Sequence, residues 1–155
     1  KHELCDQEIR EEIFSMIMAG QDTTTLIVSN TLLMLAIHKD VQLKVVKELQ
    51  GIFTSIEEPI DFEILNELPY LENVLKETLR LFPISAFTLR TVVEDFQLGD
   101  YVIPAGANLY IPVFSIHRDK NYWGDDADLF VPERFDEERI KDVHPYAYIP
   151  FTGII

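Results

Sequence analysis

One stretch decides the fold of this chain: Met16-Ile17-Met18-Ala19-Gly20-Gln21-Asp22-Thr23-Thr24-Thr25. It places an acid and three hydroxyl groups inside a long apolar run. Apolar residues continue on both sides without a proline or a turn dipeptide, so the pattern predicts one helix from about Glu8 to Ile37. At a rise of roughly 1.5 Å per residue, such a helix is about 45 Å long and can cross a whole domain.

Three explanations account for a polar centre in such a helix. The first is a membrane span, although an Asp at the centre of a spanning helix costs roughly 2.5 to 3.5 kcal/mol on insertion scales. The second is a buried structural helix whose Thr hydroxyls donate to the carbonyl four residues earlier. The third is a functional helix opened locally at Ala19-Gly20, where a ligand approaches the backbone beside the proton-handling groups Asp22 and Thr23.

Composition narrows the class of protein. The chain has 155 residues, of which 47% are hydrophobic and 26% are charged, as in a globular domain. A net charge of −14 disfavours nucleic acid and anionic membrane surfaces as partners. The single cysteine, Cys5, excludes an internal disulfide framework and a cysteine zinc site. The histidines lack metal-ligand spacing and are interpreted as surface or capping residues; they are His2, His38, His117 and His144.

Both ends of the chain suggest a piece of a larger domain. It begins with Lys1-His2, without an initiator Met or a signal peptide, and stops soon after a loop signal at Pro150. The central helix is apolar on nearly every face and has to be surrounded, yet the rest of the chain offers thin cover. We therefore expect residues 1–155 to form a single incomplete domain.

Two further helices are expected after the central one. Apolar residues recur at helical spacing from Val41 to Phe53, close to a helix stop at Gly51. Pro69 suits the first position of a third helix, which the pattern carries to Phe82. These segments favour a mainly α fold.

A small β-sheet is expected after the third helix. β-branched and aromatic residues predict strands over residues 87–93 and 96–98. Residues 101–103 and 108–111 are then interpreted as the two strands of a hairpin that turns at Pro104-Ala105-Gly106. Beyond Ser115 the pattern predicts a long irregular segment held by its side chains. The expected fold class is mainly α with a small β-sheet.

Charged residues in the second half of the chain have alternative interpretations. Glu77 and Arg80 lie three residues apart on one helix face. They form either a surface pair worth roughly 0.2 to 0.5 kcal/mol or, with Arg134, a fork that ties a distant segment to the helix. Arg90 lies inside an apolar strand, so its guanidinium either extends to solvent or meets a buried anion.

Four stretches occur in a fixed order along the chain: Ala19-Gly20-Gln21-Asp22-Thr23-Thr24, Lys76-Glu77-Thr78-Leu79-Arg80, His117-Arg118-Asp119 with Tyr122-Trp123, and Pro132-Glu133-Arg134-Phe135. In that order they resemble the C-terminal half of a cytochrome P450, a haem-thiolate monooxygenase. The sequence is most similar to the animal fatty-acid hydroxylase clan, including its insect members. The resemblance covers nearly the whole chain and implies a partial cytochrome P450 fold.

The resemblance implies a role for the polar centre of the first helix. Ala19 and Gly20 would lie over the haem and leave room for dioxygen. Thr23 would hydrogen-bond the activated oxygen, and Asp22 would relay protons to it from solvent. Splitting dioxygen in a dry pocket requires such a delivery of protons.

The resemblance also implies roles for the other candidates. Glu77, Arg80 and Arg134 would form the family's structural triad, which holds the core around the haem without being catalytic. Arg90 would pair with a haem propionate, which favours its buried-anion interpretation. Phe151 would begin the haem-binding loop, and residues 84–87 would face substrate.

Two departures from the family pattern limit these implications. The family's ligand loop reads F-x-x-G-x-R-x-C-x-G, but Ile154 stands where its Gly is expected, and no Arg or Cys follows. Cys5 lies upstream of the first helix and cannot replace that thiolate, so no metal ligand is assigned. Many members of the clan carry a Glu at the position of Ala19 and esterify it to haem, a link that Ala19 does not allow.

The expected function is that of a fragment of a monooxygenase. The full-length parent would insert one oxygen atom into an apolar substrate, such as a fatty acid, a hormone or a xenobiotic. Its electrons would come from NADPH through NADPH-cytochrome P450 reductase at the cytosolic face of the endoplasmic reticulum membrane, and the fragment alone would be inactive. The alternative is a non-catalytic relic or a helical interaction module.

Overall fold

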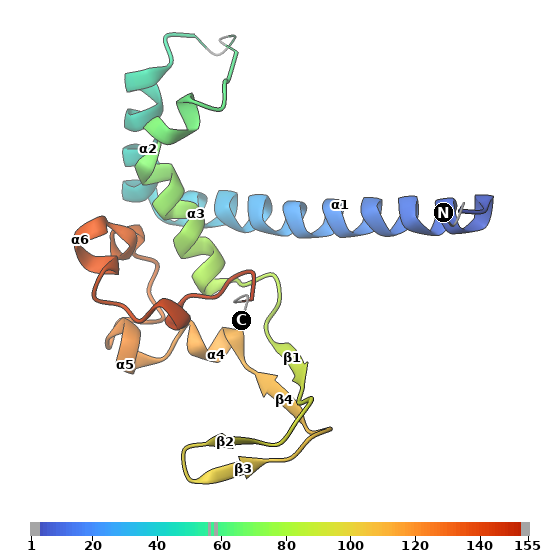
Figure 1. Cartoon of the computed structure of the whole chain (residues 1–155). Coiled ribbons are helices and arrows are strands. Elements are labelled where there is room, and N and C mark those ends of the chain that lie inside the picture. Colours follow the sequence, from blue (N-terminus) through green and yellow to red (C-terminus); the bar gives the residue numbers. More distant parts are fainter. Residues whose placement is uncertain (1–3, 56, 58, 153–155) are drawn as a thin grey trace.

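Three long helices form the upper part of the structure, a computed structural model that describes residues 4–55, 57 and 59–152. They are α1 (Asp6–Ile37), α2 (Lys39–Ile52) and α3 (Pro69–Leu81). α1 and α2 meet at His38, and α3 lies against both near that corner (Figure 1). The predicted fold class, mainly α with a small β component, is confirmed.

The helices bury one apolar cluster at this corner. Its side chains come from α1, α2, α3 and a later loop, and they are Met34, Val41, Val45, Val74, Leu81 and Phe130. Because these residues recur at helical spacing, each helix presents one apolar face to the cluster. The cluster fixes α3 against the C-terminal end of α1.

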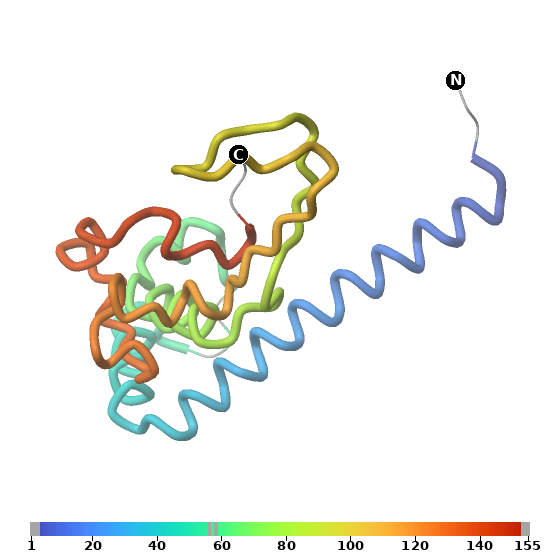
Figure 2. The backbone as a smooth tube through the Cα atoms, turned by 90° about the horizontal axis from the view of Figure 1, so that it is seen from below, coloured from blue at the N-terminus to red at the C-terminus, as the bar shows by residue number. Residues whose placement is uncertain are grey.

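The N-terminal part of α1 extends away from the remaining structure as a separate arm (Figures 1 and 2). Only Thr31 and Met34 of this helix are buried. Its exposed apolar side chains include Ile13, Phe14, Met16, Ile17 and Leu26. This exposure agrees with the expectation that the rest of the chain gives the helix only thin cover. Within that same part of the chain, no helix has the length and apolarity that a membrane span requires.

The strands form two separate antiparallel pairs. β1 (Thr88–Thr91) pairs with β4 (Asn108–Ile111), and β2 (Phe96–Leu98) pairs with β3 (Tyr101–Ile103). The expected hairpin between residues 101–103 and 108–111 is therefore wrong. Its turn residues instead bring the chain back to β1, because the Gly106 N–H donates to the Val92 carbonyl over 2.8 Å.

The turn between β2 and β3 explains the observed pairing. Leu98 lies opposite Tyr101, so only Gly99 and Asp100 connect the two strands. Gly99 has a φ of 58°, in the left-handed region that glycine adopts without a steric penalty. A two-residue turn of this kind joins adjacent strands directly.

The segment after Ser115 contains more helix than its sequence predicts. Short helices begin just before Ser115 and continue through this segment: α4 (Val113–Ile116), α5 (Lys120–Trp123), η2 (Pro132–Phe135), α6 (Glu137–Ile140) and η3 (Pro145–Ala147). A further short helix, η1 (Ile64–Glu67), lies between α2 and α3. A second buried cluster holds the segment after Ser115 together, with Trp123, Ala127, Phe135 and Ala147 at its centre. The prediction that its side chains hold this segment is confirmed, whereas the predicted lack of regular structure is wrong, because short helices form within it.

Candidate functional site

A buried ion pair lies at the centre of the structure. Arg80 Nε donates to Glu77 Oε2 over 2.6 Å, and Arg80 Nη2 donates to Glu77 Oε1 over 2.8 Å. Neither side chain has any solvent exposure. The two residues share a face of α3 because they are three positions apart. The pair is therefore a buried two-pronged fork, and the surface-pair interpretation does not describe it.

The remaining N–H groups of Arg80 bind backbone carbonyls of the C-terminal segment. Arg80 Nη1 donates to the carbonyls of His117 and Ala127, over 2.7 and 2.6 Å. Nη2 also donates to the carbonyl of Leu129 over 3.1 Å. A guanidinium has five N–H donors, and all five have an acceptor here. Arg80 thus ties three points of an irregular segment to one helix.

Glu77 and Arg134 extend this network. Glu77 Oε1 accepts from the Val131 N–H over 2.8 Å and lies 3.5 Å from Arg134 Nε. Arg134 donates through Nη1 to the carbonyl of Trp123 over 2.8 Å and through Nη2 to Asp126 Oδ2 over 2.8 Å. The structure therefore brings Glu77, Arg80 and Arg134 together, with Arg134 bound mainly to the loop that contains Asp126.

His117 is fully buried beside this network, although its sequence was interpreted as that of a surface or capping residue. Its Nε2 accepts from the Ile149 N–H over 2.8 Å, so the proton of the neutral ring is on Nδ1. That Nδ1 lies 3.2 Å from the carbonyl oxygen of Arg80 and donates to it. Burial lowers the pKa of His117 to about 4, against 6.5 for an ordinary histidine.

The polar centre of α1 is regular helix. α1 continues without a break through Ala19-Gly20, so the local opening expected there is absent. Thr23 Oγ1 donates to the carbonyl of Ala19 over 2.8 Å, which is the bond of the structural interpretation. Asp22 is exposed to solvent.

A cavity connects α1 with the end of the described chain. It measures about 290 Å³, and its walls are Thr23, Ile84, Ser85, Pro150, Phe151 and Thr152. Two candidates from opposite ends of the sequence, Thr23 and Phe151, therefore line the same space. Ile84 and Ser85, which were expected to face substrate, line it as well.

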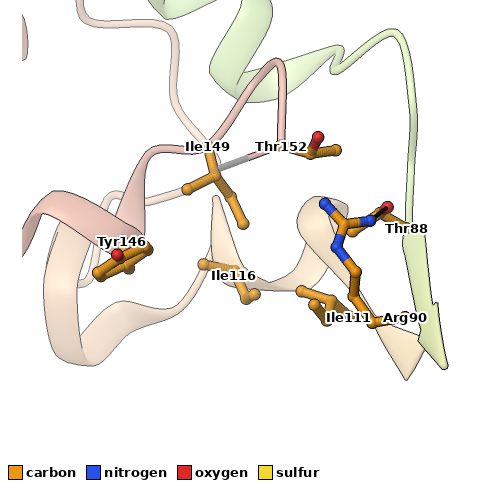
Figure 3. Close-up of a pocket in the computed structure, with 7 residues that line it drawn as sticks. All are labelled: Thr88, Arg90, Ile111, Ile116, Tyr146, Ile149 and Thr152. Carbon is orange, nitrogen blue, oxygen red and sulfur yellow. Dashed lines mark hydrogen bonds between the residues drawn. The ribbon is translucent and has the colours of Figure 1, made fainter. Parts of the chain in front are cut away.

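A second cavity of about 150 Å³ contains Arg90 (Figure 3). Figure 3 shows Arg90 and Thr88 on one side of it, with Ile116, Tyr146 and Ile149 on the other. Arg90 Nη1 donates to Thr88 Oγ1 over 3.0 Å and to the Leu89 carbonyl over 2.9 Å. Arg90 is exposed, and no ion pair within residues 4–55, 57 and 59–152 involves it.

A model of the cytochrome P450 family matches residues 1–153. The chain belongs to this family. Among curated P450s, it is 38% identical over 152 residues to cytochrome P450 4V2 of Rattus norvegicus. It is 40% identical over 154 residues to probable cytochrome P450 313a1 of Drosophila melanogaster and 37% identical over 152 residues to cytochrome P450 4c21 of Blattella germanica.

The similarity covers most of this chain and a minor part of each relative. Each of these matches includes 98% of the chain, which spans 29 to 31% of the length of these curated P450s. The predicted recognition as an animal cytochrome P450 with insect relatives is confirmed.

The residues of this P450 chain fit a haem in part. A haem is a flat apolar ring with two carboxylates at one edge. Apolar atoms form most of the surface of both cavities, and Arg90 offers a cation at one of them. The fit does not extend to the iron, because Cys5 is the only cysteine and lies exposed at the start of α1. Within the described residues, no group of three or more His, Cys, Asp or Glu side chains could hold a metal ion.

His117 is the residue of this P450 site that sequence reasoning missed. Its partners are backbone groups of Arg80 and Ile149, which carry no signature in the sequence. The only available indication is its place in the His117-Arg118-Asp119 motif. The predicted Gly-to-Ile departure at Ile154 lies outside the described residues.

Proposed function

We propose that this chain is part of a cytochrome P450 monooxygenase and contributes the helix on the oxygen side of the haem. The full-length protein inserts one atom of dioxygen into an apolar substrate, such as a fatty acid, a hormone or a xenobiotic. NADPH-cytochrome P450 reductase supplies the electrons at the cytosolic face of the endoplasmic reticulum membrane. One observation carries the proposal: Thr23 and Phe151, from opposite ends of the chain, line one cavity.

The side chains of α1 deliver protons in this proposal. Haem, when bound, supplies the iron at which dioxygen is reduced and split. Thr23 Oγ1 donates its O–H hydrogen bond to the Ala19 carbonyl, so its lone pairs are left to accept a hydrogen bond from a water molecule. Asp22 is exposed and exchanges protons with water. Consecutive helical residues do not face each other, so a water molecule has to bridge Asp22 and Thr23.

The structure contributes a scaffold beside this cavity. Ala19 and Gly20 lie on α1 just before Thr23, and a Cβ added at Gly20 meets no atom within 4 Å. We propose that this open space accommodates dioxygen and that Arg90 binds a haem propionate. The triad of Glu77, Arg80 and Arg134 holds the core and takes no part in the chemistry.

We further propose that these 155 residues alone are inactive. The only cysteine, Cys5, is exposed at the start of α1, whereas Thr23 and the cavity lie several turns further along the helix. A thiolate at Cys5 therefore cannot reach a haem beside Thr23. If the full-length protein also lacked a thiolate ligand, the non-catalytic alternative of a relic or an interaction module would replace the proposal.

Replacing Thr23 tests the proposed proton delivery. In the full-length protein, Thr23→Ala removes the hydroxyl group at the cavity, so we expect NADPH consumption to continue with peroxide replacing most of the product. Thr24→Ala is the matched control, because Thr24 is an exposed neighbour on α1 and is not part of the cavity wall. Peroxide and product are measured per NADPH consumed. Intact coupling in Thr23→Ala would leave Thr23 with a structural role only.

A further inference from the structure

The segment from Tyr148 to Thr152 forms a wall of every cavity described for this chain. Thr152 lines the cavity beside Thr23, the cavity that contains Arg90, and a third of about 250 Å³ near Tyr146. Ile149 lines two of them, and Figure 3 shows it in the cavity that contains Arg90. A shift of this segment therefore changes the shape of all three spaces together.

The Tyr148 ring packs this segment against the Phe135 and Trp123 rings, with 4.8 and 6.5 Å between centroids, and His117 and Lys76 hold it further. Ile149 N–H donates to His117 Nε2 over 2.8 Å, and Tyr148 Oη donates to the Lys76 carbonyl over 3.1 Å. The Tyr148 ring stacks on the His117 ring, with 5.4 Å between their centroids. The Thr152 N–H bonds within the segment, to the carbonyl of Ile149. His117 thus supplies two of these anchors.

The backbone of the segment is strained at Thr152. Its φ is 57°, in the left-handed region that β-branched residues rarely occupy. Such a conformation persists where surrounding contacts impose it.

His117 and Arg80 are connected in both directions. The guanidinium of Arg80 donates to the carbonyl of His117, and the imidazole of His117 donates to the carbonyl of Arg80. The ring is then oriented by α3, and its free nitrogen points at the Ile149 N–H. One imidazole therefore links the buried Glu77–Arg80 pair to the segment that forms the cavity wall.

We propose that His117 is a positioning residue, whose two ring nitrogens set the Ile149–Thr152 segment relative to the Glu77–Arg80 network. In this role it acts through the segment and touches no reacting atom. The use of the cavities for haem and substrate rests on the proposed function. The positioning itself does not.

Two variants of the full-length protein separate hydrogen bonding from packing. His117→Gln keeps one N–H donor and one carbonyl acceptor on a side chain of similar length and loses the ring. His117→Phe keeps a ring that can stack on Tyr148 and loses both hydrogen bonds. The measurement is amide hydrogen exchange of peptides covering residues 148–152, with peptides from α3 as the internal reference. It is made without added haem and without turnover, so it does not depend on the proposed activity.

We expect exchange at residues 148–152 to rise roughly tenfold in His117→Phe, because the Ile149 N–H in this segment loses its hydrogen bond. In His117→Gln, exchange should stay close to wild type, and α3 should stay protected in both variants. Retained protection in His117→Phe, or lost protection in His117→Gln, would overturn the proposal. If His117→Phe does not fold, lost protection at residues 148–152 in His117→Gln still overturns the proposal.

Discussion

At the scale of the residue, Arg80 and Glu77 form a buried ion pair whose charges depend on each other. Both are fully buried, and each charge is satisfied mainly by the other and by backbone groups. A buried pair adds little net stability relative to apolar residues, whereas removal of one partner leaves an uncompensated charge in a dry interior. The pair therefore enforces one arrangement of the chain around it.

This burial predicts a severe effect of single substitutions. In the full-length protein, Glu77→Ala or Arg80→Ala should lower the free energy of unfolding by about 3 to 5 kcal/mol and abolish haem incorporation. Glu72→Ala is the matched control, because Glu72 forms an exposed pair with Lys76 and should cost under about 0.5 kcal/mol. Denaturant unfolding and haem content measure the two effects. Wild-type haem content in Glu77→Ala would contradict the prediction that the buried pair is required for haem incorporation.

His117 predicts a pH dependence of stability. Burial lowers its pKa to about 4 in the folded protein, and the positive charges of Arg80 and Arg118 act in the same direction. The unfolded chain binds a proton below about pH 6.5, whereas the folded chain binds it only below about pH 4. The stability linked to neutral His117 is thus complete above pH 6.5 and is lost as the pH falls towards 4.

We expect protonation of His117 in the unfolded chain to lower the free energy of unfolding by up to about 3 kcal/mol, at 1.36 kcal/mol per pKa unit. Unfolding free energies of wild-type protein and His117→Gln at pH 7 and pH 4.5 test it. Wild type should lose more stability than the variant over this interval, because glutamine does not titrate. Equal losses in the two proteins would show that His117 is not held neutral.

Only part of this residue-level picture is predictable from sequence. The spacing of Glu77 and Arg80 places them on one face, and the isolated Arg134 suggests a partner for them. The two bonds of His117 are invisible, because backbone groups that meet through the fold leave no pattern. The roles of Asp22, Thr23, Ala19, Gly20, Arg90 and Phe151 in oxygen and haem chemistry remain predictions.

At the scale of the element, α3 is held from outside at its first turn. The Glu48 carboxylate of α2 accepts from the N–H groups of Tyr70 and Leu71, over 2.7 and 2.9 Å. Glu133 of η2 adds a second connection, accepting from Lys44 Nζ over 2.6 Å and from Tyr70 Oη over 2.9 Å. The helix that carries Glu77 and Arg80 is therefore fixed to α2 at one end and to the C-terminal segment along its length.

The contact at the start of α3 can be tested by Glu48→Ala in the full-length protein. It removes the acceptor of two N–H groups that lack partners inside the helix and a negative charge near the positive end of its dipole. We expect the free energy of unfolding to fall by about 0.5 to 2 kcal/mol. Glu63→Ala is the control, as Glu63 is exposed outside the helix. If both variants lose equal stability, Glu48 does not cap α3.

Elements differ in how well sequence predicts them. The three helices are recognised because their apolar spacing is local, and Pro69 marks the start of α3. The predicted strand pairing is wrong because residues 108–111 pair with β1, about twenty positions earlier, and not with residues 101–103. The opening expected in α1 is absent because the hydroxyl of Thr23 bonds back to Ala19 and the helix needs no break.

At the scale of the whole molecule, the structure has a well-packed corner and an uncovered arm. The corner unites the three helices and the C-terminal segment around the Glu77–Arg80 pair, whereas much of the apolar surface of α1 is exposed. Thr23 lies between them, at the cavity that α1 shares with Phe151. Since the chain spans 29 to 31% of the length of these curated P450s, the proposed chemistry belongs to the full-length protein.

The reduced, carbon-monoxide-bound absorption spectrum tests this account most directly. It should be recorded for the full-length protein and, in parallel, for the 155-residue chain mixed with haem. We expect the full-length protein to give a Soret band at the position of a thiolate-ligated haem and the shorter chain to give none, because Cys5 lies far from the cavity. A thiolate band from the shorter chain, or its absence from the full-length protein, would contradict the account.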